Sequence, residues 1–221
     1  MVVNTAGFVT EEVADHAILL LLAVARKLVW LHNRVKGGEW APTGSELYEI
    51  PRLYGRVLGL VGFGSIARAT ANRAKPFGLD VIAYDPYVSQ WMARELWVEL
   101  VPSLEELAAR SDFVSAHMPL NDQTMGMLGE AFFKAMKPTA FLINTCRGPV
   151  VDEAALINAL ESREIAGAGL DVFQDEPLAS DHPLWTTPGV LITPHVAASG
   201  PYLDKRRTDL FFENCVRFNE G

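Results

Sequence analysis

The chain has 221 residues, of which 49% are hydrophobic and 21% charged, and its formal net charge is −8. This composition is typical of a packed soluble fold with one large or two small domains. The acidic balance excludes a protein that binds nucleic-acid backbones, which needs a clustered basic face, although backbone amides can still hold the phosphates of one small ligand.

The two cysteines, Cys146 and Cys215, are too few for a disulfide framework and lack the spacing of a metal site. We therefore predict no metal and a cytoplasmic, reducing location. The longest apolar run, residues 17–25, is too short to span a bilayer. Acidic residues precede it instead of the basic segment of a signal peptide, so we expect a buried helix and no membrane contact.

The first ten residues look extended and lead into one long expected helix over 10–36. Thr10 is its expected N-cap, and Gly37-Gly38 ends it. Apolar residues fill nearly every position over 17–25, which is typical of a helix buried on several sides. We expect this helix to pack on something besides its own domain, either a second domain or another subunit.

From residue 56 the pattern alternates between apolar strands and helices, which indicates a parallel sheet with helices on both faces. The predicted fold class is therefore α/β, a doubly wound parallel sheet. The expected strands are 57–61, 80–84, 97–101, 113–117, 140–144, 166–172 and 190–193. The expected helices after the first are 65–76, 103–110, 129–136, 152–162 and 200–218.

A glycine-rich turn, GLVGFGSIA, joins the first of these strands to a helix. Gly62 permits the tight turn, Gly64 lets the backbone approach a pyrophosphate, and the small Ala67 lets helix and strand pack closely. The free amides of Ser65 and Ile66 would face the phosphates. A turn of this kind also occurs as a plain strand-to-helix connection, so its context must distinguish the two interpretations.

Asp85 supplies that context, because it closes the next strand 21 residues after Gly64. A carboxylate at this place can accept both ribose hydroxyls of an adenosine and repels a 2′-phosphate. Pro86 and Tyr87 follow it, where an arginine would favour a phosphorylated ribose. We therefore predict a Rossmann-like dinucleotide site that takes NAD rather than NADP.

Three ionisable residues follow strand-like runs in the second half of the chain. The planar fork of Arg147 suits a 2-keto carboxylate, and the Gly148-Pro149 turn after it favours a fixed placement over a surface arginine that caps a helix. His195 could exchange a proton with a carbonyl oxygen. Glu176 beside that imidazole would fix its tautomer, a contact that sequence spacing alone does not establish.

Other polar residues give weaker indications. Asp171 ends an apolar strand, where a nicotinamide carboxamide could pair with it, and the alternative is a helix-cap or hinge acid. We expect the neighbouring arginine to lower the pKa of Cys146, but no base is at hand to make it a nucleophile. His16 and His32 fall in the first helix and are expected to be packing or interface residues.

Six segments resemble the D-isomer-specific 2-hydroxyacid dehydrogenase family: NTAGFVTEEVADHAILLLLAVAR, GRVLGLVGFGSIARATA, HMPLNDQT, INTCRGPVVDEAAL, GAGLDVFQDEPL and TPHVAASG. The resemblance implies hydride transfer between NAD(H) and a D-2-hydroxy or 2-keto acid. It implies that Arg147 grips the substrate, that His195 is the acid/base and that Glu176 partners it. With the glycine turn, the implied cofactor contacts are Gly62, Gly64, Ser65, Ile66, Asp85, Met118, Pro119, Thr124, Thr145, Cys146, Arg147, Asp171, His195 and Ala198.

The family has two domains, and the chain matches mainly the cofactor-binding one. The resemblance implies that residues 1–9 are a remnant of the substrate domain or hinge and that 10–200 form the NAD-binding domain, with 10–36 as its interface helix. Residues 201–221 would form a helix that returns to the substrate domain. The family's long helix helps to form a dimer, so a homodimer is expected. The alternative function is a regulatory or association module that binds NAD(H) without turnover.

Overall fold

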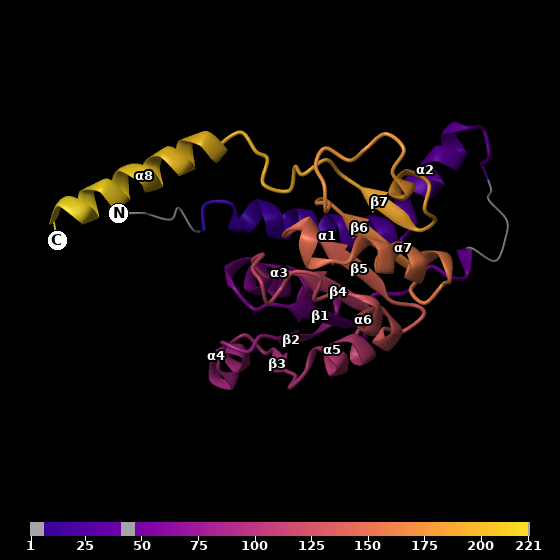
Figure 1. Ribbon diagram of the computed structural model, residues 1–221, viewed down its shortest axis with the longest axis horizontal. Coiled ribbons are helices and arrows are strands. Elements are labelled where there is room, and N and C mark those ends of the chain that lie inside the picture. Colours follow the sequence, from indigo (N-terminus) through magenta and orange to yellow (C-terminus); the bar gives the residue numbers. More distant parts are fainter. Residues whose placement is uncertain (1–6, 41–46, 221) are drawn as a thin grey trace.

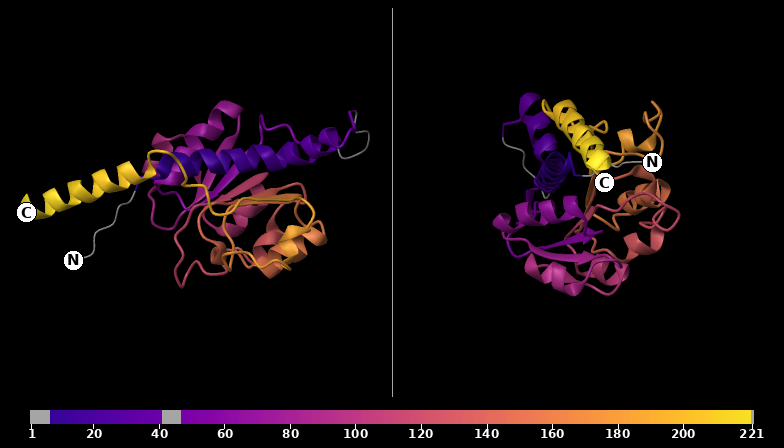
Figure 2. Two further views of the ribbon diagram at one scale, coloured as in Figure 1. Left: turned by 90° about the horizontal axis from the view of Figure 1, so that it is seen from above. Right: turned by 90° about the vertical axis from the view of Figure 1, so that its left-hand side faces the viewer.

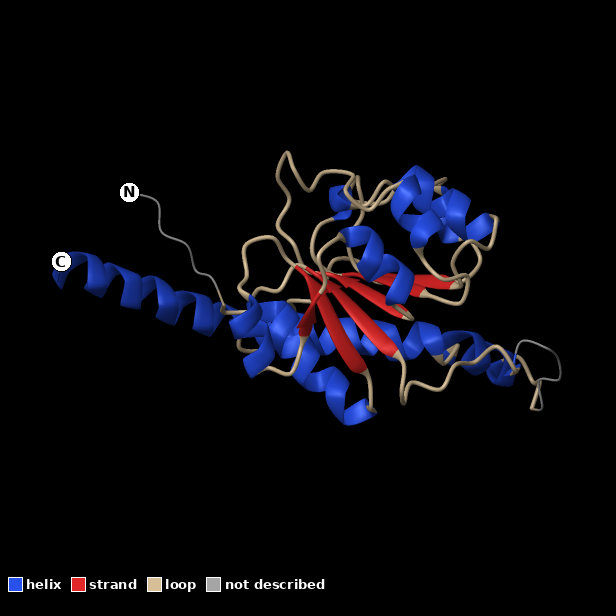
Figure 3. Ribbon diagram, turned by 90° about the horizontal axis from the view of Figure 1, so that it is seen from below, coloured by secondary structure: helices blue, strands red, loops and turns tan. Residues whose placement is uncertain are grey.

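Seven parallel strands form a single sheet at the centre of the computed structural model, which describes residues 7–40 and 47–220. The strand order is β3-β2-β1-β4-β5-β6-β7. Strands β2 and β3 therefore extend the sheet on one side of β1, and β4 to β7 extend it on the other. Helices cover both faces (Figures 1 and 3). The prediction of a doubly wound parallel sheet is confirmed. The strands are β1 (Val57–Val61), β2 (Asp80–Tyr84), β3 (Glu99–Leu100), β4 (Phe113–Ala116), β5 (Phe141–Asn144), β6 (Gly167–Leu170) and β7 (Val190–Ile192).

The α-helices of the described residues agree with the expected ones except near the N-terminus and at α4, which was not predicted. Polar side chains set several of the starts: Ser89 begins α4 by accepting a hydrogen bond from Met92 N, and Asp152 begins α7 by accepting one from Ala155 N. The helices are α1 (Thr10–Ala25), α2 (Leu28–Lys36), α3 (Ser65–Ala74), α4 (Gln90–Glu95), α5 (Leu104–Arg110), α6 (Glu130–Ala135), α7 (Glu153–Glu161) and α8 (Leu203–Glu220).

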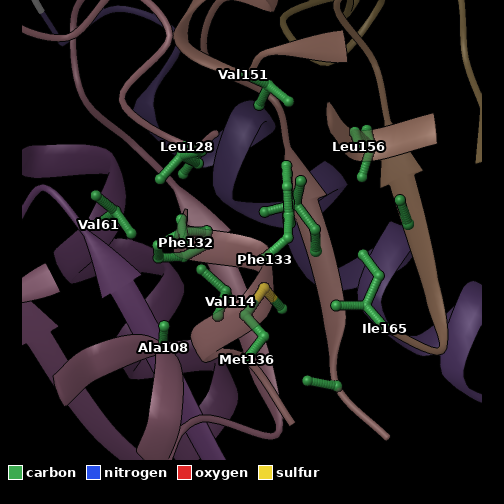
Figure 4. Close-up of a cluster of buried hydrophobic side chains, with 14 of the residues drawn as sticks. Val61, Ala108, Val114, Leu128, Phe132, Phe133, Met136, Val151, Leu156 and Ile165 are labelled. Carbon is green, nitrogen blue, oxygen red and sulfur yellow. The ribbon is translucent and has the colours of Figure 1, made fainter. Parts of the chain in front are cut away.

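The two faces of the sheet carry separate apolar cores because successive strand residues point to opposite sides. On β5, Phe141 and Ile143 belong to the core beneath α1 and α3. Leu142 between them belongs to the core beneath α5, α6 and α7, which includes Phe133 and Leu156. Figure 4 shows this second cluster. Burial on both faces explains why the strands are almost wholly apolar.

The single helix expected over 10–36 is two helices. Lys27 takes a left-handed conformation, with φ of 51°, which ends the hydrogen-bond ladder of α1 before α2 begins. Thr10 is also not the N-cap: it is the first residue of α1, and Val9 before it makes no side-chain cap. Neither glycine nor proline marks this break in the sequence.

Helix α1 lies against its own sheet, so most of its apolar surface needs no second domain to cover it. Leu20 and Leu21 are each 1% exposed. A Cβ on Gly169 of β6 would lie 3.0 Å from the Cβ of Leu20, which shows how closely helix and sheet approach. Leu19, by contrast, is 54% exposed, and α2 buries none of its residues. Exposed apolar side chains therefore remain on one side of α1 and on α2.

Helix α8 extends away from the rest of the molecule (Figure 2). Near its start, Arg206 forms an ion pair with Glu12 of α1. Phe211, Phe212 and Val216 are more than half exposed along it. A helix is confirmed where one was expected after residue 200. No helix in the described part of the chain is long and apolar enough to cross a membrane.

Candidate active site

The parallel sheet brings the predicted site residues together, because all its strands end at the same edge, where ligands of open α/β sheets bind. The glycine turn follows β1, and the loops after β2, β4, β5, β6 and β7 meet there. By strand the residues are Gly62, Gly64, Ser65 and Ile66 after β1; Asp85 after β2; Met118, Pro119 and Thr124 after β4; Thr145, Cys146 and Arg147 after β5; Asp171 and Glu176 after β6; and His195 and Ala198 after β7.

The glycine turn has the shape that a pyrophosphate requires. Gly62 has φ of +84°, and a Cβ there would lie 3.1 Å from backbone atoms of His117 and Met118. Gly64 has nothing within 4 Å of its absent Cβ, so its outer face is open. No side chain caps α3, which leaves the first amides of this helix, at Ser65 and Ile66, at the positive end of its dipole.

Asp85 ties the glycine turn to the end of β2. Its Oδ2 accepts a hydrogen bond from Phe63 N at 2.8 Å, and its Oδ1 accepts one from Tyr87 N at 2.8 Å. Each carboxylate oxygen keeps a second lone pair, so both can still accept a ribose hydroxyl. The negative charge at the same place opposes a 2′-phosphate, as the sequence predicts.

Thr145, at the end of β5, has a hydroxyl that fits a bound polar group. The residue is 6% exposed, and its Oγ1 has no hydrogen-bond partner within the described structure. A buried polar group left without a partner costs about 1–3 kcal/mol. Thr124 differs, because its hydroxyl donates to Pro119 O at 2.6 Å and so shapes its own loop.

The expectation of a lowered pKa for Cys146 is wrong. Burial raises the pKa of this thiol to about 11 and outweighs the opposing charge of Arg147. Its Sγ donates to Asn144 Oδ1 at 3.2 Å. The buried Asn144 also donates from Nδ2 to Arg147 O at 3.0 Å, so it shapes the turn that presents the arginine. Its position as a polar residue ending an apolar strand is the sequence signal for that role.

Arg147 stands exposed on a turn whose position is fixed by its neighbour. A Cβ on Gly148 would lie 1.8 Å from the carbonyl oxygen of Phe173, so only glycine fits there. This contact places the Arg147 turn directly against the loop after β6, which carries Glu176. The prediction that the Gly148-Pro149 turn gives the arginine a fixed placement has a structural reason in this close approach.

His195 and Glu176 form the contact that sequence spacing could not establish. His195 Nδ1 lies 2.6 Å from Glu176 Oε2, and Glu176 Oε1 accepts from Phe173 N at 3.0 Å. Partial burial opposes ionisation of Glu176, but its hydrogen bonds from His195 and Phe173, with the charge of Arg147, lower its pKa overall. With Nδ1 engaged by the carboxylate, Nε2 remains to exchange a proton with a ligand.

Asp171 has its hydrogen-bond partners within the chain. Its carboxylate is fully buried and accepts from Thr193 Oγ1 at 2.6 Å, Val196 N at 3.0 Å and Ala197 N at 2.7 Å. Its backbone oxygen accepts from His195 N at 2.8 Å. Because the acid has its partners within the chain, its burial gives no argument for a nicotinamide contact.

His16 reaches this turn from α1. Its Nε2 lies 2.9 Å from Thr193 Oγ1 and 3.5 Å from Asp171 Oδ1. Since the Thr193 hydroxyl donates to Asp171, His16 is the donor to Thr193. His16 is thus a packing residue within the domain, whereas His32 is exposed on α2.

A recess of about 580 Å³ lies beside the histidine–glutamate pair. Apart from the pair and Thr193, its lining is apolar. The lining residues are Phe173, Glu176, Pro177, Leu178, Trp185, Ile192, Thr193, Pro194 and His195.

The raised pKa predicts that Cys146 reacts slowly. At pH 7.5 a thiol with a pKa of about 11 carries about 100-fold less thiolate than an ordinary cysteine, and the thiolate is the reactive form. We expect the Cys215→Ser variant, which keeps Cys146, to react with a disulfide reagent at least about 100-fold more slowly than the Cys146→Ser variant. Equal rates in the two folded variants would contradict the assignment, and denaturation should equalise them.

Comparison with known proteins places this chain in a family. The sequence profile of the D-isomer specific 2-hydroxyacid dehydrogenase, NAD binding domain, matches residues 18–197. A glyoxylate reductase of Korarchaeum cryptofilum is 43% identical over 221 residues, which are 100% of this chain and 66% of that protein. A D-3-phosphoglycerate dehydrogenase of Archaeoglobus fulgidus is 39% identical over 90% of this chain and 37% of its own length.

Solved structures show the same similarity. The apo D-mandelate dehydrogenase of Rhodotorula graminis superposes with a TM-score of 0.87 at 33% identity, covering 97% of this chain and 64% of that one. The chain spans about two thirds of the length of the glyoxylate reductases that it matches. The chain belongs to the D-isomer specific 2-hydroxyacid dehydrogenase family and corresponds to its NAD-binding domain.

Proposed function

We propose that this chain is the cofactor-binding and acid/base part of an oxidoreductase that interconverts 2-keto acids and D-2-hydroxy acids. The observation that carries the proposal is the 2.6 Å contact between His195 Nδ1 and Glu176 Oε2, on the sheet edge that also holds Arg147 and the glycine turn. An acid/base pair, a cation for a carboxylate and a dinucleotide turn together suit carbonyl reduction.

The cofactor would be held by the residues predicted for it. The amides of Ser65 and Ile66 would bind the pyrophosphate, and Asp85 would bind the adenosine ribose. Thr145 would offer its unpartnered hydroxyl toward the nicotinamide end. Met118, Pro119, Thr124, Cys146, Asp171 and Ala198 would line the same edge. NADH, when bound, supplies the hydride.

The chain's own residues would orient the substrate and move the proton. Arg147 would hold the carboxylate of a 2-keto acid in a bidentate contact and draw electron density from the adjacent carbonyl. His195 Nε2 would donate a proton to the carbonyl oxygen in reduction and take it back in oxidation. Glu176, bonded to Nδ1, would keep the ring in the orientation and tautomer that this transfer needs.

The proposal also covers the domain limits, the domain that α8 contacts and the cellular location. Of the expected substrate-domain remnant 1–9, residues 1–6 lie outside the described residues. We infer that α8 belongs with a substrate domain, since its apolar side chains are exposed. Both cysteines are free, in keeping with a reducing, cytoplasmic location.

Replacing the histidine should separate chemistry from binding. We expect His195→Gln to lower the rate of NADH oxidation with glyoxylate by about 100-fold or more, because general acid catalysis contributes about 10²–10⁴-fold. NADH affinity, measured by fluorescence titration, should change little. Glu161→Gln, on the exposed end of α7, is the control. Loss of both turnover and NADH binding would indicate a folding role for His195.

The same titration distinguishes the two function classes. A wild-type chain that binds NADH but oxidises none with glyoxylate, hydroxypyruvate or related keto acids would favour the regulatory module over the enzyme.

We also propose a homodimer through the exposed apolar side chains of α1 and α2. Leu19, Leu28, Val29 and Val35 are each more than 40% exposed, and a second copy would cover them. Light scattering during size-exclusion chromatography at micromolar concentration should give twice the 24.3 kDa mass of one chain. A measured mass of 24.3 kDa would contradict the proposed homodimer.

A further inference from the structure

A second carboxylate, that of Glu153, holds the loop on which Glu176 stands. Glu153 is the first residue of α7 and is 7% exposed, although glutamate is rarely buried without partners. Its Oε1 accepts a hydrogen bond from Gln174 N. Its Oε2 lies 3.3 Å from His182 Nε2. One side chain thus contacts the loop at two places, eight residues apart.

The proton on His182 can be assigned from its other contact. His182 Nδ1 accepts a hydrogen bond from Leu184 N at 3.3 Å, at the start of the short 3-10 helix Pro183–Trp185. In a neutral imidazole the second nitrogen then carries the proton, so the protonated Nε2 faces the Glu153 carboxylate. Glu153 therefore accepts one hydrogen bond, from Gln174 N, and lies within ion-pair distance of His182.

The peptide between Phe173 and Gln174 is where these contacts act on the site. Phe173 N donates to Glu176, and Gln174 N donates to Glu153. Gly148 lies directly against the same peptide, since a Cβ on Gly148 would lie 1.8 Å from Phe173 O. Asp171 holds the His195 turn separately. A shift of the Phe173–Gln174 peptide would therefore move Glu176 relative to His195.

We propose that Glu153 is a positioning residue for the His195–Glu176 pair. Glu153 contacts neither the His195 ring nor the Glu176 carboxylate, and it acts through the backbone of the loop after β6. Its catalytic meaning rests on the proposed function, whereas its effect on the His195 ring does not.

Glutamine cannot replace this glutamate. A side-chain amide has one acceptor oxygen, so when that oxygen receives the hydrogen bond of Gln174 N, the NH₂ group faces the proton on His182 Nε2. His182 cannot turn its ring to help, because Nδ1 already accepts from Leu184. Glu153→Gln keeps the size of the side chain and removes one of the two attachments of the loop.

The test reads the His195 ring directly, in the full chain labelled with ¹⁵N-histidine. Long-range ¹H–¹⁵N spectra show which ring nitrogen carries the proton, and the loss of a signal in His195→Gln assigns it among the five histidines. In spectra recorded at a pH where the ring is neutral, we expect the His195 proton on Nδ1 in the wild type and a mixture of both tautomers in Glu153→Gln. Turnover should fall by about 10- to 100-fold with NADH affinity unchanged. Glu161→Gln, on the exposed end of the same helix, is the control.

A second variant keeps the proposal testable if Glu153→Gln fails to fold. His182→Asn keeps an acceptor for Leu184 N but cuts the contact to Glu153, and it should shift the His195 signal in the same direction. A folded Glu153→Gln protein with an unchanged His195 signal would overturn the proposal, as would an unchanged signal in His182→Asn if Glu153→Gln fails to fold. A wild type without turnover would count against the proposed function, and the His195 signal would still decide the role of Glu153.

Discussion

The buried carboxylate of Asp171 is the contact on which the geometry of the site depends. A fully buried carboxyl group needs hydrogen-bond donors, and this one has the Thr193 hydroxyl and two backbone amides. Those donors lie on either side of His195, which has a left-handed backbone, with φ of 53°. A non-glycine residue keeps such a conformation only where its surroundings hold it, and here the acid does so.

Three acids then position one imidazole, that of His195. Asp171 fixes the backbone of His195, Glu176 fixes its ring, and Glu153 fixes the loop that carries Glu176. Asp171 and Glu176 follow β6, whereas Glu153 lies after β5 and His195 after β7, and these residues meet because parallel strands end at a common edge. His16 adds α1 to this arrangement through Thr193, so the helix that covers the sheet also supports the site.

Local signals in the sequence were enough for the parallel sheet and most of its helices. The apolar runs 57–61 and 80–84 give the bounds of β1 and β2 as observed, and the glycine turn with Asp85 marks the cofactor edge. The break at Lys27 was missed because a lysine in a left-handed conformation leaves no mark in an apolar pattern. The sign of the Cys146 pKa shift was missed because burial depends on the packed structure, whereas the sequence shows only the neighbouring arginine. The Glu153–His182 contact joins residues on separate elements, and spacing alone does not reveal it.

A crystal structure of the chain grown with NADH tests the central claim most directly, namely that this edge of the sheet holds the dinucleotide against the histidine–glutamate pair. The account predicts the pyrophosphate on the amides of Ser65 and Ile66, the adenosine ribose on Asp85, a hydrogen bond to the Thr145 hydroxyl and the nicotinamide facing His195. A dinucleotide bound elsewhere, or one at this edge with its nicotinamide turned away from His195, would contradict it.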